Sequence, residues 1–230
     1  MDGLSALGFE DSKALGDRLV AFGSMLLEAG RTTSLVGARS MDELVAKHFL
    51  DSLAPLVGLE LRSPVIDVGS GAGLPGIPAA LAFPDERFVL LEPRKRRFEF
   101  LRAAIAGLGL RNVEAVQMTA ETAARGDWRE SAGAVLMRAI GPARVALELG
   151  VGLMARQGIL ALYRGRDERP AAADLRVARV LGAEFTESRP ITVPYLDAER
   201  HLWVFRKVRA TPAGYPRRSG IPGKEPLTGE

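Results

Sequence analysis

The stretch 65–78, VIDVGSGAGLPGIP, constrains the fold more than any other part of the chain. Its apolar beginning suits a buried strand, three glycines follow at alternate positions, and a helical apolar pattern resumes at Ile77–Phe83. Glycine tolerates positive φ and leaves room for a ligand where a Cβ would collide. The start of the following helix adds unpaired N–H groups. We therefore predict a strand, a tight turn that receives a ligand, and a helix.

Two classes of ligand fit the glycine spacing. Gly71, Gly73 and Gly76 match the dinucleotide fingerprint G-x-G-x-x-G, in which a pyrophosphate lies on the helix start. Asp67 followed by Gly69, Gly71 and Gly73 is similar to the first motif of class I S-adenosylmethionine (AdoMet) methyltransferases. A glycine turn with no ligand is the third alternative.

The charge of Asp67 favours AdoMet. A carboxylate at the end of the strand would repel a pyrophosphate, whereas it attracts the sulfonium and ammonium groups of AdoMet. Pro75 and Pro78 also lack the amide protons that a phosphate would need. We therefore predict that Asp67 and the glycines at 69, 71 and 73 bind AdoMet.

The composition excludes several kinds of site. The chain has no cysteine and only two histidines, which rules out disulfides, thiolate sites and histidine-rich sites, so no metal is expected. No apolar run approaches about 20 residues, and the N-terminus does not resemble a signal peptide. We therefore expect a cytoplasmic protein with no membrane partner. A net charge of +3 permits an anionic partner such as RNA.

The length of 230 residues allows one α/β domain and an extension. We expect an N-terminal helical extension over 1–60, an AdoMet-binding domain over 61–208 and a basic Pro/Gly-rich tail over 209–230, in a protein that acts as a monomer. Apolar periodicity predicts helices over Lys13–Ala29, ended by Gly30, and over Met41–Leu59.

The second of these helices carries two polar features. Ser40 and Glu43 have the spacing of a capping box at its start. His48 and Asp51 share one face of the helix. These two side chains form either a polar packing contact or part of the mouth of the cofactor site, because the helix leads directly into the strand before the glycine turn.

A second acidic position follows the next strand, Phe88–Leu91. Glu92 lies about 25 residues after Asp67, where nucleotide-type cofactors find an acid for their ribose hydroxyls. Pro93 is expected to start a helix that Gly109 ends. The basic run 94–97 at its beginning is either a solvated surface or a set of RNA-phosphate contacts, for which the candidates are Arg94, Lys95 and Arg97.

The remaining pattern alternates strands and helices. We predict strands over Val113–Gln117, Ala134–Met137, Ile159–Tyr163, Phe185–Val193 and His201–Lys207, the last two as an antiparallel hairpin, and helices over Val145–Ala155 and Pro170–Leu181. Ala120 and Glu121 follow the strand 113–117 and are candidates to contact the adenine of the cofactor. The chain lacks the Asn/Asp-Pro-Pro-aromatic turn typical of amine methyltransferases and the cysteine of carbon-5 enzymes.

The C-terminal segment 206–224 is basic and contains no acid. Its prolines and glycines exclude regular structure. It is either a disordered tail or an RNA-binding arm that becomes ordered on contact, in which Tyr215 stacks on a base. Its cationic candidates for RNA binding are Arg217, Arg218 and Lys224.

Five motifs together carry a resemblance that spans essentially the whole chain. They are KHFLDSL at 47–53, DVGSGAGLPGIP at 67–78, KRRFEFL at 95–101, Arg138-Ala139, and YPRRSGIPGKEPL at 215–227. In this order they resemble the bacterial ribosomal RNA small-subunit methyltransferase G family, also called glucose-inhibited division protein B.

The resemblance implies a class I, Rossmann-like fold: a mostly parallel seven-stranded sheet with an N-terminal helical extension. It implies transfer of a methyl group from AdoMet to N7 of a guanine in the 530 loop of 16S rRNA, in free RNA or in the small ribosomal subunit. Carried over by position, the cofactor contacts are Gly69, Leu74, Ala120, Glu121 and Arg138.

Three positions depart from the family pattern. Ser34-Leu35-Val36 replaces Asn-Leu-Thr, Glu92-Pro93 replaces Asp-Ser, and Tyr163-Arg164-Gly165 replaces Leu-Lys-Gly. Arg164 keeps the positive charge of the usual lysine and is a further candidate for RNA binding, although its geometry differs.

Guanine N7 has an available lone pair, so its methylation needs alignment with the cofactor rather than a general base. We predict that Arg138 positions the reactants, with a plain salt bridge as the alternative. A small-molecule AdoMet methyltransferase, a non-catalytic RNA-binding module and a dinucleotide oxidoreductase remain alternative functions.

Overall fold

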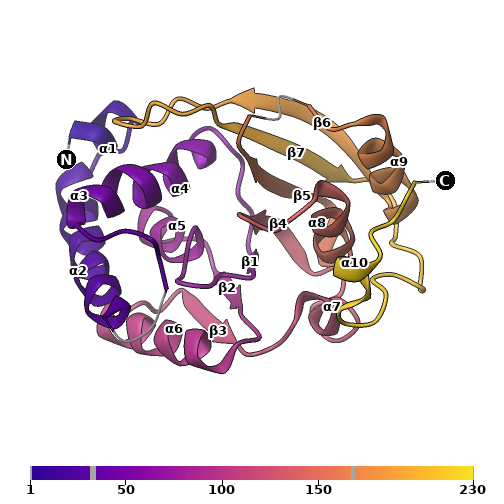
Figure 1. Ribbon diagram of the computed structural model, residues 1–230, viewed down its shortest axis with the longest axis horizontal. Coiled ribbons are helices and arrows are strands. Elements are labelled where there is room, and N and C mark those ends of the chain that lie inside the picture. The colour runs from indigo at the N-terminus through magenta and orange to yellow at the C-terminus, as the bar shows by residue number, and fades with distance from the viewer. Residues whose placement is uncertain (1, 32–34, 167–168, 230) are drawn as a thin grey trace.

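The computed structural model describes residues 2–31, 35–166 and 169–229 (Figure 1). Its helices are α1 (Asp2–Ala6), α2 (Ser12–Gly30), α3 (Met41–Leu44), the π-helix η1 (Val45–Leu50), α4 (Asp51–Leu53), the 3₁₀-helix η2 (Ala54–Leu56), α5 (Gly76–Ala82), α6 (Lys95–Gly107), α7 (Ala120–Ala123), α8 (Ala143–Val151), α9 (Ala172–Leu181) and α10 (Ile221–Lys224). Its strands are β1 (Val65–Val68), β2 (Phe88–Leu91), β3 (Val113–Val116), β4 (Ala132–Met137), β5 (Met154–Arg164), β6 (Ala183–Pro190) and β7 (His201–Lys207).

The strands form one seven-stranded sheet in the order β3-β2-β1-β4-β5-β7-β6. Strands β3 to β5 pair in parallel, and β7 runs antiparallel to both β5 and β6. The predicted fold class, a mostly parallel sheet that ends in an antiparallel hairpin, is confirmed. In such a sheet the carboxyl ends of the parallel strands meet at one edge, where ligands bind.

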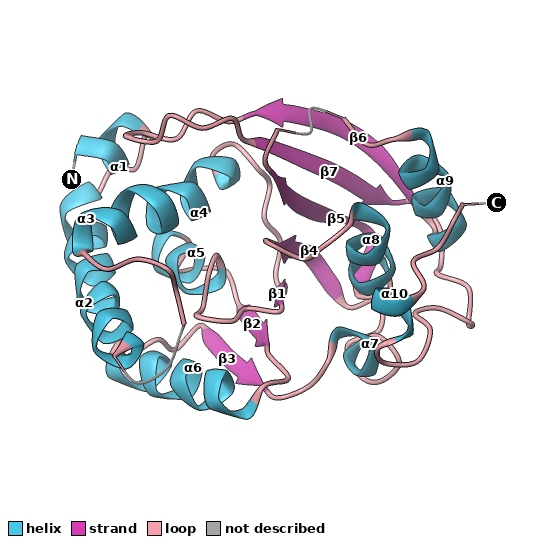
Figure 2. Cartoon of the chain, in the orientation of Figure 1, coloured by secondary structure: helices cyan, strands magenta, loops and turns pink. Residues whose placement is uncertain are grey.

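Helices cover both faces of the sheet. Figure 2 shows α2 and α4–α6 on one side and α7–α10 on the other. The first face is one hydrophobic cluster to which residues of the N-terminal helices, α5 and α6 all contribute. Within it, Phe22 of α2 is fully buried and stacks on Phe49 of η1 with 5.7 Å between ring centroids. The N-terminal helices are therefore fixed to the sheet by a shared core.

The helix predicted over Met41–Leu59 is a chain of short segments. Ser40 caps its start as predicted, accepting a hydrogen bond from the N–H of Glu43, but the Glu43 carboxylate accepts from the N–H of Arg39 rather than completing the capping box. The middle widens into η1, and Pro55 at the beginning of η2 cannot donate a backbone hydrogen bond. The predicted helix is therefore present without a break as far as Leu56, three residues short of the predicted end, but its middle is π-helical and its last turn is 3₁₀.

Other boundaries shift by a few residues. Helix α6 begins at Lys95 rather than Pro93, because Glu92 accepts the N–H of Arg94 and holds that residue in an extended conformation. Helix α8 ends at Val151, and the chain then enters β5 at Met154, so the predicted helix Val145–Ala155 was too long.

The C-terminal tail is folded onto the α7–α8 side of the molecule (Figure 1). Arg129 donates to the carbonyls of Thr211 and Tyr215 at 2.7 and 2.9 Å. The short helix α10 then forms with Pro222 in its first turn, where proline is tolerated. The expectation that the tail has no regular structure was wrong.

No helix in the described ranges is long and apolar enough to cross a bilayer.

Candidate functional site: a pocket at the carboxyl edge of the sheet

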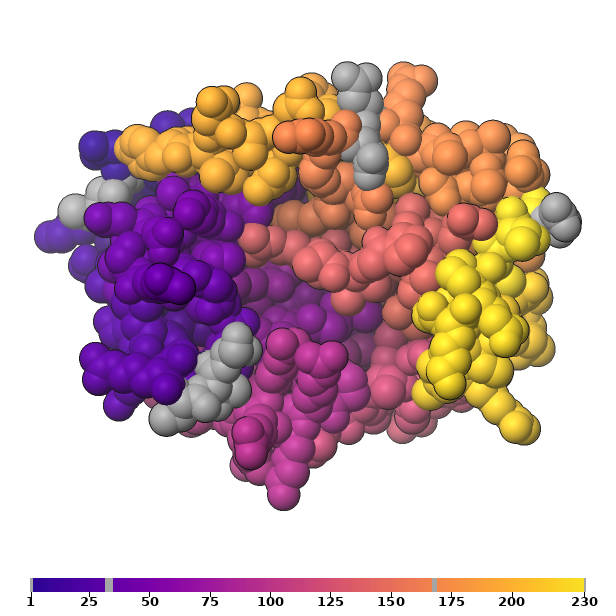
Figure 3. Space-filling model, viewed as in Figure 1, coloured from indigo at the N-terminus to yellow at the C-terminus, as the bar shows by residue number. Residues whose placement is uncertain are grey.

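The functional candidate is a pocket of about 530 Å³ at the carboxyl edge of the sheet, which we call the main pocket. Figure 3 shows this face hollowed at its centre, between the N-terminal helices, the beginning of α6 and the segment after β4. The pocket is lined by Leu35, Val36, Gly37, His48, Gly69, Ser70, Gly71, Ala72, Leu74, Glu92, Pro93, Arg94, Arg97, Arg138, Ala139 and Ile140.

The glycine turn forms the floor of the main pocket. Gly69, Gly71 and Gly73 have φ values of 68°, 57° and 86°, a region that favours glycine. A Cβ on Gly71 would be in ordinary van der Waals contact with the Arg97 guanidinium, 3.6 Å away. A Cβ on Gly73 would instead lie 2.6 Å from Ile77. Gly71 therefore borders the pocket, whereas Gly73 allows the turn to pack on α5 and does not line it.

Asp67 supports the turn from below. Its Oδ2 accepts the N–H of Gly76 at 3.0 Å, and a Cβ on Gly76 would lie 2.6 Å from that oxygen. The other oxygen, Oδ1, is buried without a hydrogen-bond partner. Complete burial raises the pKa of Asp67 to about 7. Asp67 lies beneath the lining of the main pocket, so its predicted cofactor contact stays a prediction.

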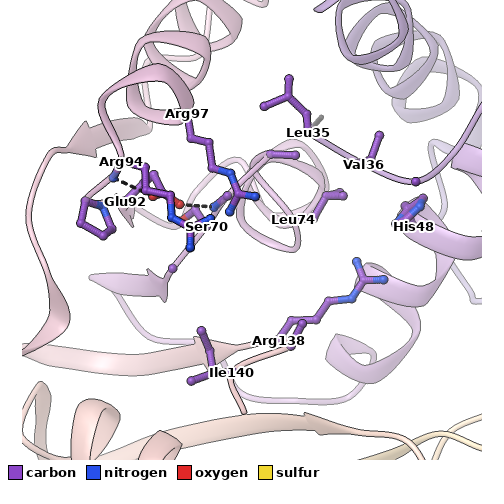
Figure 4. A pocket seen from close by; sticks show the side chains of 16 residues that line it. Leu35, Val36, His48, Ser70, Leu74, Glu92, Arg94, Arg97, Arg138 and Ile140 are labelled. Atoms are coloured by element: carbon purple, nitrogen blue, oxygen red, sulfur yellow. Dashed lines mark hydrogen bonds between the residues drawn. The ribbon is translucent and has the colours of Figure 1, made fainter. Parts of the chain in front are cut away.

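Glu92 holds the turn from the side. Its Oε2 accepts the N–H of Gly71 at 2.9 Å, and its Oε1 accepts the N–H of Arg94 at 2.8 Å. Both contacts are drawn in Figure 4. Each carboxylate oxygen can accept a further hydrogen bond, so Glu92 can still receive ribose hydroxyls as predicted.

In the basic run 94–97, some side chains line the main pocket and others face solvent. Arg94 and Arg97 line the main pocket (Figure 4). Lys95 is exposed and lies 3.9 Å from Glu99 on the outer face of α6. The two arginines are placed where a cofactor and an RNA strand could both reach them.

Arg138 lies on the opposite wall (Figure 4). It follows β4, and its guanidinium contacts the segment 47–52. Its Nη2 donates to Asp51 Oδ2 at 2.6 Å and to the Lys47 carbonyl at 3.1 Å, and its Nη1 donates to Ser52 Oγ at 3.2 Å. From the sequence, Asp51 could form either a packing contact or part of the cofactor site. In the structure it binds Arg138, a residue of the pocket wall.

His48 also lines the main pocket. Burial and the neighbouring charge of Arg138 lower its pKa, against the opposing effect of Asp51. The imidazole is therefore predominantly neutral at pH 7.

Ala120 and Glu121, the predicted adenine contacts, do not line the main pocket. They form the start of α7, and Glu121 Oε1 accepts the N–H of Gly220 at 3.0 Å. The hydroxyl of Thr119 also lies 3.0 Å from that of Ser219. These residues hold the tail at the carboxyl edge, and their cofactor role stays a prediction.

The predicted RNA contacts of the tail differ in accessibility. Arg217 donates to both carboxylate oxygens of the fully buried Glu148, at 2.8 and 2.7 Å. Tyr215 packs against the apolar cluster on the α7–α9 side. Arg218 and Lys224 are exposed. Arg164 ends β5, with its guanidinium 4.9 Å from the ring centre of Trp203.

Sequence reasoning missed several lining residues. Leu35 and Val36 were considered only as departures from a family pattern, and Ser34 before them lies outside the described residues. Ile140 was missed because its only signal is its place just after β4. Its methyl group would lie 2.9 Å from a Cβ on Gly69, so it borders the glycine turn.

The donor set fits AdoMet better than a dinucleotide. The N–H groups of Gly71 and Gly76, which a pyrophosphate would need, are already bound by Glu92 and Asp67. The Glu92 carboxylate, which lines the pocket beside the turn, suits a cofactor with cationic groups and a ribose. The apolar side chains at 35, 36, 74 and 140 provide the apolar surface that such ligands bury. Fold and pocket together define a class I AdoMet-dependent methyltransferase.

Comparison with known proteins gives the family. The family model GidB, described as rRNA small subunit methyltransferase G, matches residues 16–201. Ribosomal RNA small subunit methyltransferase G of Deinococcus deserti is 34% identical over 98% of this chain and 93% of its own length. The protein of the same name from Pelotomaculum thermopropionicum is 36% identical over 89% and 87%. The chain belongs to this family, which confirms the predicted AdoMet-dependent rRNA methyltransferase class.

Solved structures agree on the fold. A putative transferase of Pyrococcus horikoshii aligns over 70% of this chain and 64% of its own with a TM-score of 0.55 and 14% identity. A mutant 16S rRNA (adenine(1408)-N(1))-methyltransferase from Catenulisporales acidiphilia aligns over 64% and 86%, with a TM-score of 0.51 and 19% identity.

Proposed function

We propose that this protein transfers the methyl group of AdoMet to N7 of one guanine in the 530 loop of 16S rRNA. The observation that carries the proposal is the match to small-subunit methyltransferase G over nearly the whole chain, tail included. When bound, AdoMet would supply an electrophilic methyl on a sulfonium; the guanine N7 lone pair can accept this methyl without prior loss of a proton, and the electrons of the broken C–S bond leave with S-adenosylhomocysteine. The protein's task is alignment of the two reactants.

The lining of the main pocket suits that task. Its one histidine has a pKa lowered by burial and by the charge of Arg138, and the reaction asks no proton transfer of it. Arg138 is fixed by contacts to the segment 47–52 and borders the pocket. We assign Arg138 the positioning of the reactants, Gly69, Gly71 and Leu74 the cofactor, Glu92 its ribose, and Ala120 and Glu121 its adenine side.

RNA contacts surround the pocket in this proposal. Arg94 and Arg97 stand at its edge, and Arg164, Arg218 and Lys224 extend the cationic surface. Arg217 is bound to Glu148 and contributes by holding the tail. The protein acts as a monomer in this proposal, since its exposed large apolar side chains, Val20, Val57, Val180 and Tyr195 among the described residues, are few. Its place in the cytoplasm is proposed from its similarity to rRNA methyltransferases.

The test is transfer of labelled methyl from AdoMet to small ribosomal subunits from cells that lack this gene, with the modified base located by cleavage at 7-methylguanosine. One labelled guanine in the 530 loop is expected. AdoMet binding without label in RNA would contradict the proposal and favour a small-molecule or non-catalytic function.

A variant refines this test. Arg138→Gln should lower turnover even at temperatures where the variant is fully folded, because the guanidinium borders the pocket. Its melting temperature should also fall, since its partner Asp51 is only 5% exposed. A fall in activity that only follows a fall in melting temperature would make Arg138 a structural residue.

A further inference from the structure

One carboxylate, that of Asp51, connects three parts of the chain near the main pocket. Its Oδ2 accepts from Arg138 after β4 at 2.6 Å, and its Oδ1 accepts from Nε of Arg200 before β7 at 2.7 Å. Asp51 itself begins α4, in the N-terminal helices, and is 4% exposed. From this geometry we propose that Asp51 is the positioning residue that holds Arg138 at the wall of the cofactor pocket.

The contacts of Arg138 show why one residue controls it. Among the described residues, the three hydrogen-bond partners of its guanidinium come from the segment 47–52, and only Asp51 among them carries a charge. Charge-assisted hydrogen bonds are shorter and stronger than neutral ones. The contacts to the Ser52 hydroxyl and the Lys47 carbonyl, at 3.2 and 3.1 Å, are longer and neutral. Asp51 therefore supplies most of the attraction.

The segment that presents Asp51 is itself anchored to the sheet. Ser52 Oγ donates to the His48 carbonyl at 2.6 Å, and the Tyr163 hydroxyl of β5 donates to the Ser52 carbonyl at 2.8 Å. Asp51 and Ser52 are both buried. The carboxylate is thus held by a rigid support, so that it can fix the arginine in one orientation.

Asp51 has a second effect on the pocket, because its negative charge neutralises the charge of Arg138. Under the proposed function, on which this inference rests, the cofactor and the methylated guanine both carry positive charge next to Arg138. An unpaired guanidinium there would repel both. In the ion pair, the negative charge of Asp51 offsets the positive charge of Arg138, and Arg138 can still donate hydrogen bonds.

The substitution Asp51→Asn removes the negative charge that holds Arg138 and keeps the shape of the side chain. Its carbonyl oxygen replaces only one of the two oxygens that the arginines bind, and the amide group in the other place would face a guanidinium with donors of its own. We expect Asp51→Asn and Arg138→Gln each to weaken AdoMet affinity and to lower turnover by roughly 10- to 100-fold. The variant that combines Asp51→Asn with Arg138→Gln should lose no more AdoMet affinity and turnover than either single variant, because both substitutions remove the same interaction.

Arg200→Gln is the matched control, because it removes the other ion pair of the same carboxylate and leaves Arg138–Asp51 in place. It should keep AdoMet affinity and turnover within about twofold of the unmodified protein. Its melting temperature reports what the purely structural contact contributes.

Asp51→Asn could fail to fold, because two arginines would then converge without a carboxylate. The variant Asp51→Asn with Arg200→Gln relieves that repulsion, and it should fold yet retain the loss of AdoMet affinity measured by calorimetry. The proposal is overturned if Asp51→Asn, or this double variant, binds AdoMet like the unmodified protein, or if Arg200→Gln loses as much as Asp51→Asn. If the variants show the expected AdoMet affinities but the unmodified protein puts no label into RNA, the proposed reaction is contradicted and the role of Asp51 is not.

Discussion

The glycine turn and the C-terminal tail each rest on a carboxylate removed from water, and their electrostatic surroundings differ. Under the turn, Asp67 is 1% exposed, binds one backbone N–H and leaves Oδ1 without a partner. Under the tail, Glu148 is 0% exposed, and both of its oxygens accept from Arg217. Burial alone disfavours the charged form of a carboxyl, and a paired guanidinium restores it. The turn is thus supported by a carboxyl that readily takes up a proton, and the tail by an ion pair.

The largest effect expected from this difference is on the pH dependence of stability. The pKa of Asp67 rises from 3.8 in the unfolded chain to about 7 on folding, which corresponds to roughly 4 kcal/mol. Between these values the folded state binds more protons, so this carboxyl makes unfolding easier as the pH rises from about 4 to 7. Asp67→Asn should remove that part of the slope in melting curves recorded from pH 4 to 8.

Asp85→Asn is the matched control, because Asp85 is exposed. It should leave the slope as it is in the unmodified protein. An Asp67→Asn variant with an unchanged slope would show that Asp67 is ionised when folded.

The next effect concerns the ion pair. Glu148→Gln keeps one acceptor but removes the charge, and it should cost about 2–3 kcal/mol in urea denaturation. It should also release the tail, so that trypsin cleaves faster after the exposed Arg218 and Lys224. Glu225→Gln serves as the control, since Arg217 binds the backbone carbonyl of Glu225. Equal proteolysis of both variants would mean that the pair does not hold the tail.

The smallest effect on stability is expected for the neighbouring arginine. Arg218→Gln should change the free energy of unfolding by less than about 0.5 kcal/mol, because the side chain is exposed. It should weaken RNA affinity and lower the slope of log affinity against log salt by about one. Arg156→Gln, at the opposite end of β5 from Arg164, controls for charge alone. Identical salt slopes for the two variants would remove Arg218 from the RNA surface.

The same two regions show what a sequence can predict. The determinants of the glycine turn are local: an apolar strand, an acid and glycines in one stretch, which specify the turn before any distant contact forms. Even there, Gly73 was predicted to contact the cofactor, because the sequence does not show that the Ile77 side chain occupies the space beside Gly73.

The tail could not be predicted in this way. Arg217 lies 69 residues from Glu148, and Gly220 lies 99 residues from Glu121. Prolines and glycines in this segment indicated an irregular chain, but nothing in the local pattern identifies the polar partners that fix it. The bond between Arg138 and Asp51, 87 residues apart, was missed for the same reason.

The π-helix Val45–Leu50 has a consequence for how this part of the chain can change. A π-helical turn accommodates one residue more than an α-helical turn of the same length. It ends immediately before Asp51, and the Lys47 carbonyl and His48 belong to it. Deletion of a single residue there would turn it into an ordinary helical turn of nearly the same length and leave Asp51 facing both arginines, whereas the same deletion in an α-helical turn would rotate the residues beyond it by about 100°. This segment should therefore tolerate the loss of one residue better than the α-helical parts of the chain.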